Sequence, residues 1–209
     1  VEVFVGLTSG AAVIVSQFYG AQDRKNLDRT IHTAAAFSII AGLVIGVAGF
    51  FASDTILQMM NTPAELMDES RIYLHIYFAG TVFNLVYNMG AAVLRAMGDS
   101  RRPLYVLITA CLLNILLDIL LVVIGGMGVE GVAIATIFCQ GVSAVLVAAM
   151  LVKGQGNFKL EFKKIRFYGN SLRSVLRIGV PAGIEAAMYC VATVSYTHLR
   201  AHETVLDLV

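Results

Sequence analysis

Long apolar stretches follow one another along the whole chain, and short polar segments separate them. A helix rises about 1.5 Å per residue, so roughly 20 apolar residues cross the hydrocarbon core of a bilayer. Residues 3–22, 33–53 and 72–94 contain no Asp, Glu, Lys or Arg. The pattern predicts an all-α, polytopic transmembrane helix bundle with about six spans, at Val3–Gly20, Ile31–Ala52, Ile72–Leu94, Leu104–Gly125, Glu130–Val152 and Val175–Val194.

The segments between these predicted spans alternate in charge. Those near 21–30, 95–103 and 153–174 are rich in Lys and Arg. The segment between the second and third spans, residues 53–71, is mainly acidic, and residues 126–129 contain no basic residue. Lys and Arg are retained on the cytoplasmic side of a membrane. We therefore expect a multi-pass protein of the inner (cytoplasmic) membrane with those three segments in the cytoplasm. The first span then runs inward, and a cytoplasmic N-terminus requires a further span before Val1, so we expect a truncated start.

Composition agrees with a membrane protein and excludes other classes. The chain is 58% hydrophobic and 14% charged, whereas roughly a quarter of the residues in soluble domains are charged. The net charge of +1, with the basic residues in short segments, gives no reason to expect a nucleic-acid partner. Cys111, Cys139 and Cys190 lie in apolar stretches without metal-ligand spacing, so we interpret them as packing residues and expect neither a disulfide nor a zinc site.

Asp118 is the most informative residue, because it lies within a predicted span. A carboxylate there costs about 2.5–3.5 kcal/mol on insertion scales, so it is rarely retained without a task. Asn114 lies one helical turn away, and Thr136 in the next span lies at a similar depth, roughly 10 Å below the outer surface. Asp118 can therefore serve as a proton-binding group, or it can ligate Na⁺ together with Asn114 and Thr136. The alternative is a satisfied polar cluster that only fixes helix packing.

Several motifs in and between the spans resemble the multidrug and toxic compound extrusion (MATE) family. They are Gln17-x-x-Gly20-Ala21, Arg95-x-x-Gly98-Asp99 followed by Pro103, Asn114-x-x-x-Asp118, Gly125-x-x-Gly128-x-x-Gly131, and Arg177-x-Gly179-x-Pro181-x-Gly183. Each motif alone is weak, but their order and their side of the membrane agree with the family over residues 1–194. The resemblance implies helices two to seven of a protein with two related lobes.

The resemblance also implies a division of the chain. Residues 1–152 would form first-lobe transmembrane helices, 153–174 a basic cytoplasmic inter-lobe loop, and 175–194 the first helix of the second lobe. Residues 195–209 do not continue the apolar pattern, and their first part resembles translated sequencing-adapter DNA. We interpret 195–209 as a non-native tail, with a genuine polar terminus as the alternative.

The function that the resemblance implies is transport and not enzymatic catalysis. A cation-coupled (H⁺ or Na⁺) antiporter would export drugs and other amphipathic, often cationic, compounds by alternating access, with no cofactor besides the coupling ion. The family pattern places a cation site at Asp118, Asn114 and Thr136, together with an acidic residue on an earlier helix that this sequence lacks. At full length we expect a monomer whose partners are small organic substrates and membrane lipid.

Other polar residues in the spans are less decisive. Glu185 departs from the family pattern, so a site role and a packing role are both open. Asn84 and Asn88 share one face of a predicted helix and can line a cavity or join neighbouring helices. Arg95 and Asp99, four residues apart at a helix end, are expected to pair and to anchor the topology.

Two further functions compete with drug export. A lipid-linked oligosaccharide flippase of the same superfamily would need basic residues deep in the membrane for its pyrophosphate, and the predicted spans contain none near their centres. An integral membrane enzyme would need clustered acidic residues or two apposed aspartates, which a single deep Asp and a displaced Glu do not provide. The sequence contains no nucleotide-binding loop, so we do not expect ATP to drive transport within this segment.

Overall fold

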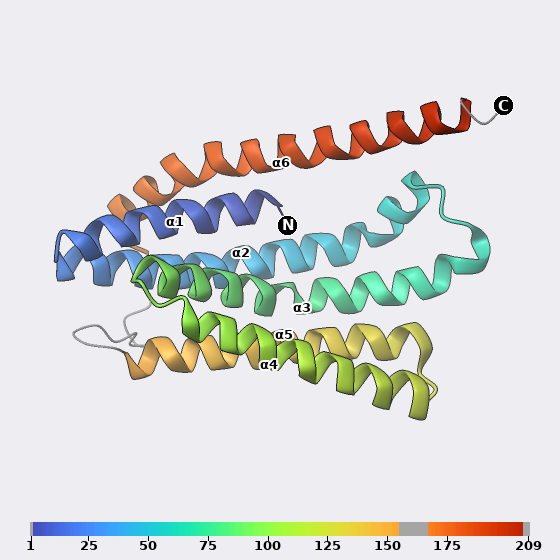
Figure 1. Ribbon diagram of the computed structural model, residues 1–209, viewed down its shortest axis with the longest axis horizontal. Helices are drawn as coiled ribbons and strands as arrows, with labels where there is room; N and C mark the ends of the chain where they lie inside the picture. The colour runs from blue at the N-terminus through green and yellow to red at the C-terminus, as the bar shows by residue number, and fades with distance from the viewer. Residues whose placement is uncertain (1, 155–166, 207–209) are drawn as a thin grey trace.

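The computed structural model describes residues 2–154 and 167–206, and in these residues it contains helices and no strand. The helices are α1 (Glu2–Gly20), α2 (Arg24–Met59), α3 (Ala64–Ala96), α4 (Arg101–Asp118), the π-helix η1 (Ile119–Ile124), α5 (Gly128–Lys153) and α6 (Gly169–Leu206). They form an antiparallel bundle (Figure 1). The all-α prediction is confirmed. Most of the predicted inter-lobe loop lies outside the described residues.

Five helices of the described part are long and apolar enough to cross a membrane: α2, α3, α4 with η1, α5, and residues 169–193 of α6. The remaining predicted span, Val3–Gly20, coincides with the 19-residue α1, which is not in that set. The helices extend beyond the predicted spans, because a helix continues into polar sequence for as long as no residue breaks it. Asp23 begins α2 as an N-cap by accepting a hydrogen bond from the Asn26 N–H.

Helix α6 extends beyond the predicted last span. We expected the last span to end at Val194, but the helix continues to Leu206. The apolar stretch does end near that point, since the membrane-span candidate stops at Thr193. Residues 195–206 contain neither glycine nor proline, so a polar composition ended the hydropathy signal without ending the helix.

Successive connections fall alternately at the two ends of the bundle, as in any antiparallel arrangement of helices. The α1–α2 and α3–α4 connections lie at one end, together with the end of α5 and the start of α6, and the α2–α3 and α4–α5 connections lie at the other (Figure 1). The larger buried cluster lies near the first of these ends and comes from α1 to α5, with Val15, Leu27, Ile31, Val93, Leu94, Val106, Val147 and Leu151. The end with the basic segments is therefore tightly packed.

Packing differs strongly between helices. α3 contacts α1, α2 and α5, whereas α4 packs mainly on α5. No residue in the most apolar stretch of α4 and η1 is buried, so this helix presents its apolar side chains outward, as expected for a helix that faces lipid or another membrane helix. α6 packs along α1, and the contact is so close that a Cβ at Gly6 or Gly10 would overlap the backbone of Gly183 or Gly179.

Candidate functional site

Asp118 lies where the fourth transmembrane helix changes its winding. It is the last residue of α4, and the chain continues directly as the π-helix η1. The wider winding is seen in the bond from the Gly125 N–H to the Leu120 carbonyl, at 2.9 Å. π-helical segments are rare and occur frequently at functional sites. The local backbone therefore distinguishes Asp118 from an ordinary residue of a membrane helix.

The carboxylate of Asp118 has an unusual environment. Among the described residues, its Oδ1 is the one buried side-chain oxygen or nitrogen without a hydrogen-bond partner. Buried polar groups are nearly always hydrogen-bonded, and leaving one unpaired costs about 1–3 kcal/mol. An oxygen in this state is available to a proton, a cation or a donor group. This observation does not fit a fully satisfied polar cluster.

Asn114 and Asp118 both approach α5 near Cys139. The Asn114 side chain lies within hydrogen-bonding reach of the Cys139 thiol, and Asp118 is close enough for its charge to act on that thiol. Cys139 is buried. We interpreted Cys139 only as a packing residue, because no sequence signal tied it to Asp118. The one available hint was its position three residues after Thr136, on the same side of the helix.

Thr136 lies on α5, which packs against both α4 and η1. Its hydroxyl donates to the Val132 carbonyl at 2.9 Å, so the hydroxyl oxygen keeps a lone pair for another partner. Carboxylate, amide and hydroxyl oxygens are the ligand types that hard cations prefer. The residue types at Asp118, Asn114 and Thr136, together with the unpaired Oδ1, fit one small cation or a proton. No group of three or more His, Cys, Asp or Glu side chains that could hold a metal occurs in the described part of the chain.

The other predicted polar residues have different environments. The Asn88 side-chain amide donates to the Asn84 carbonyl and to the Asn84 side-chain oxygen, both at 2.9 Å. These two residues therefore stabilise one turn of α3 together. Glu185 is exposed on α6, next to the exposed Ile184, Met188 and Tyr189. It lies away from the buried glycine face that contacts α1.

The expected pair between Arg95 and Asp99 is wrong. Asp99 instead forms an ion pair with Arg102 at 3.2 Å and accepts a hydrogen bond from the Arg102 backbone N–H. The reason is the preceding turn, where Gly98 adopts a φ of +89° and directs Asp99 toward the start of α4. Asp99 therefore stabilises the first turn of α4, and Arg95 is exposed at the end of α3.

Comparisons with known proteins identify the class of this bundle. The chain matches the MatE family over residues 1–120, and it belongs to this family. It is 33% identical over 183 residues to the probable multidrug resistance protein YpnP of Bacillus subtilis (strain 168), covering 87% of this chain and 40% of that protein. It is 30% identical to the probable multidrug resistance protein YoeA of the same strain, covering 95% of this chain and 44% of that protein.

Solved structures of the family share the fold. A crystal structure of MATE in the bent conformation superimposes with a TM-score of 0.86 at 25% identity, covering 92% of this chain and 43% of that one. An outward-facing multidrug resistance MATE family transporter of the MOP superfamily gives 0.85 over the same shares. The chain thus spans less than half the length of the relatives it matches, and the predicted family is confirmed.

Proposed function

We propose that the full-length protein containing this chain is a cation-coupled exporter of drugs and other amphipathic organic compounds. Relatives in the family are named as probable multidrug resistance proteins, which supports drug export as the transport activity and speaks against an enzymatic role. Export would proceed by alternating access in the cytoplasmic membrane. Residues 1–152 would contribute most of one lobe and α6 the first helix of the other, with Glu185, Asn84 and Asn88 as candidates for the cavity wall.

Asp118 is the coupling group in this proposal, and its buried, unpaired Oδ1 is the observation that carries it. A carboxylate only accepts hydrogen bonds, whereas a protonated carboxyl also donates one. Binding a proton therefore changes which neighbours Asp118 can bond, and so favours one packing of α4 on α5 over another. Asn114 and Cys139 are the neighbours that would respond to this change.

Sodium coupling would use the same residues. Na⁺ would be held by Asp118, with the Asn114 side-chain oxygen and the Thr136 hydroxyl as further ligands. The bound ion would neutralise the carboxylate in the membrane, where an uncompensated charge is costly. In both versions the coupling ion compensates Asp118, and the gradient of that ion supplies the driving force for export.

Efflux of ethidium from everted vesicles tests the proposal, using the full-length protein under an imposed H⁺ gradient and then an imposed Na⁺ gradient. We expect Asp118→Asn to lower gradient-driven efflux by roughly tenfold or more, because the substitution removes the group that binds the ion. The gradient that drives the wild type identifies the ion. Asp99→Asn is the matched control, since it removes a carboxylate that pairs with Arg102 at the helix end and should retain efflux.

Two results would contradict the proposal in different ways. Wild-type efflux that survives Asp118→Asn, with equal expression, would return Asp118 to a packing role. A wild type that moves no ethidium or other cationic dye under either gradient would contradict drug export itself.

A further inference from the structure

The start of α6 is attached to the first turns of α2 by three polar contacts. The Thr33 hydroxyl oxygen accepts a hydrogen bond from the Tyr168 backbone N–H at 3.2 Å. The Arg29 guanidinium lies 5.4 Å from the centre of the Tyr168 ring, a cation–π distance. The hydroxyl oxygens of Thr30 and Ser171 lie 3.5 Å apart, and both side chains are buried. We call these five residues the α2–α6 clasp.

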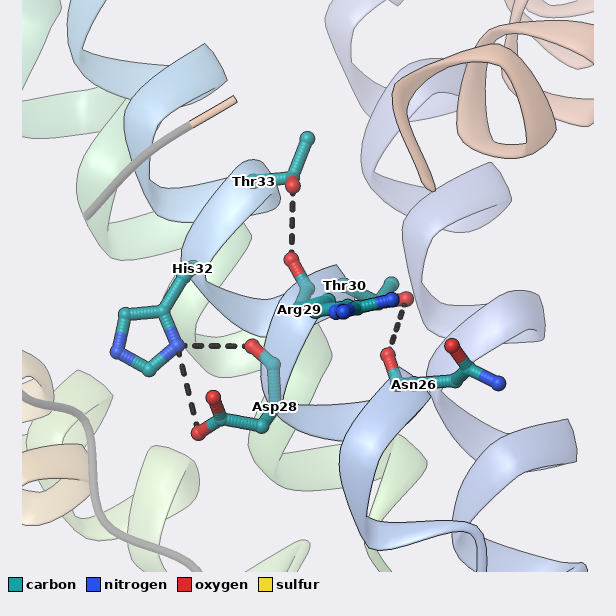
Figure 2. A network of polar contacts seen from close by, with 6 residues as sticks. All are labelled: Asn26, Asp28, Arg29, Thr30, His32 and Thr33. Carbon is teal, nitrogen blue, oxygen red and sulfur yellow. Dashed lines mark hydrogen bonds and ion pairs between the residues drawn. The ribbon is translucent and has the colours of Figure 1, made fainter. Parts of the chain in front are cut away.

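The α2 side of the clasp is held in place by its own helix (Figure 2). The Thr33 hydroxyl donates to the Arg29 carbonyl at 2.7 Å, and the Thr30 hydroxyl donates to the Asn26 carbonyl at 2.8 Å. In the same turns, the ring of buried His32 contacts the Asp28 carbonyl at 2.8 Å, on the side of the helix away from Arg29 and Thr30 (Figure 2). These bonds within α2 hold both hydroxyls without any contribution from α6.

The clasp supplies a hydrogen-bond acceptor for the first backbone N–H at the start of α6. The Tyr168 carbonyl accepts the first bond of the helix, from the Leu172 N–H at 2.9 Å, so Tyr168 lies at the N-cap of α6. Its own N–H points out of the helix and needs an outside acceptor, which Thr33 provides from 135 residues away in sequence. The position at which α6 begins is therefore set by α2.

The contact between α6 and α1 is of a different kind. It is formed by facing glycine backbones, Gly10 with Gly179 and Gly6 with Gly183. Such a close approach of two helix backbones depends on van der Waals packing. The clasp joins the start of α6 to the first turns of α2, at the bundle end that also holds the α1–α2 connection (Figure 1). When α6 moves away from α2 there, water can replace each hydrogen bond.

We propose that the α2–α6 clasp is a gate that holds the two lobes together at the cytoplasmic end, and that it opens in each transport cycle while the glycine contact remains as the pivot. This inference rests on the proposed function, in which α6 belongs to the second lobe. When the lobes separate on the cytoplasmic side, the clasp residues exchange their contacts for water. The same residues re-form the contact when the protein opens outward.

Cross-linking the clasp in the full-length protein tests this gate. Thr30→Cys combined with Ser171→Cys places two thiols where the hydroxyl oxygens lie 3.5 Å apart. We expect oxidation to form the disulfide and to lower ethidium efflux roughly tenfold or more, and we expect reduction to restore it. The single variants Thr30→Cys and Ser171→Cys, oxidised in the same way, are the matched controls and should keep their efflux.

A second measurement does not depend on transport. Ser171→Cys should react slowly with a membrane-impermeant maleimide added from the cytoplasmic side, and the rate should rise several-fold when Thr33→Val also removes the Tyr168 contact. Protein with wild-type Ser171 measures the background from the native cysteines.

The outcomes separate the gate from the proposed function. A pair that does not cross-link, or a cross-linked protein that exports ethidium at the uncross-linked rate, overturns the gate. An unchanged maleimide rate in Thr33→Val also overturns it. If the reduced double variant and the wild type both fail to export any dye, the proposed function fails, and the maleimide rates still decide whether the clasp opens.

Discussion

Two polar clusters in this bundle are built in opposite ways. At the start of α2, the hydroxyls of Thr30 and Thr33 bond to carbonyls of their own helix and reach Ser171 and the backbone of Tyr168. At the junction of α4 and η1, Asp118 retains a buried oxygen without a partner. The first cluster lies between α2 and the start of α6, and the second lies on α4, the helix with an unburied apolar stretch.

This difference distinguishes a polar cluster that stabilises helix packing from a polar group that is available to bind an ion. A polar network whose members are all hydrogen-bonded stabilises one arrangement of helices, and its members need no further partner in that arrangement. A buried group without a partner costs free energy in the same fold, so its retention indicates a task outside folding. By this criterion we interpret the α2–α6 clasp as a structural contact, and we propose Asp118 as a binding group.

The largest effect is expected at Asp118 itself. Asp118→Asn should raise the free energy of unfolding by about 1–3 kcal/mol, because a neutral amide is less costly to bury than a carboxylate whose Oδ1 has no partner. Thermal unfolding of the purified full-length protein at a pH where carboxylates are ionised measures this change. A variant that loses both efflux and stability would place Asp118 in the same structural class as the clasp.

A somewhat smaller change of opposite sign is expected at the clasp. Thr33→Val should lower the free energy of unfolding by about 1–2 kcal/mol, because the Tyr168 N–H loses its acceptor. Thr109→Val is the control, since its exposed hydroxyl bonds the Tyr105 carbonyl in the same helix and should change stability little. Equal melting temperatures for both variants would show that the Thr33 contact contributes nothing.

Thr136→Val should barely change stability, by about 0.5 kcal/mol or less, because its hydroxyl donates to a carbonyl of its own helix. Its effect should appear in coupling, as a higher concentration of H⁺ or Na⁺ needed for half-maximal efflux. Thr109→Val again provides the comparison, with the same kind of bond away from Asp118. If Thr136→Val leaves the ion dependence unchanged, Thr136 is not a ligand.

The smallest effect concerns pH and the N-cap of α2. Hydrogen bonds from the Asn26 backbone and side chain lower the pKa of Asp23 below its ordinary value. The stabilisation by Asp23 is therefore present above the pKa of the unfolded chain and is lost as the pH falls through the lower pKa of the folded state. Asp23→Asn keeps a capping oxygen without titrating, so its melting temperature should fall less on acidification than that of the wild type. Parallel pH profiles would contradict this role.

Much of the candidate site was accessible from the sequence, because its signals are local. The spacing of Asn114 and Asp118 places them one turn apart in any helix, and the cost of a carboxylate in a membrane marks Asp118 without a structure. Cys139 was missed, since its contact with Asn114 depends on how α4 packs on α5. The π-helix after Asp118 also left no pattern, because its residues are uniformly apolar.

The sequence by itself determined which segments form the long apolar helices, and its Lys and Arg pattern predicts which connections share one side of the membrane. Hydrophobicity selects each span individually and Lys and Arg assign its ends, so neither needs a neighbouring helix. Only the tertiary structure decided which helices touch. Lipid is as apolar as a leucine side chain, so the apolar pattern does not specify the partner of a span. The pairing of α6 with α1 through glycines, the start of α6 on Thr33 of α2, and the turn of Asp99 toward Arg102 all depend on the shapes of surfaces that meet only after folding.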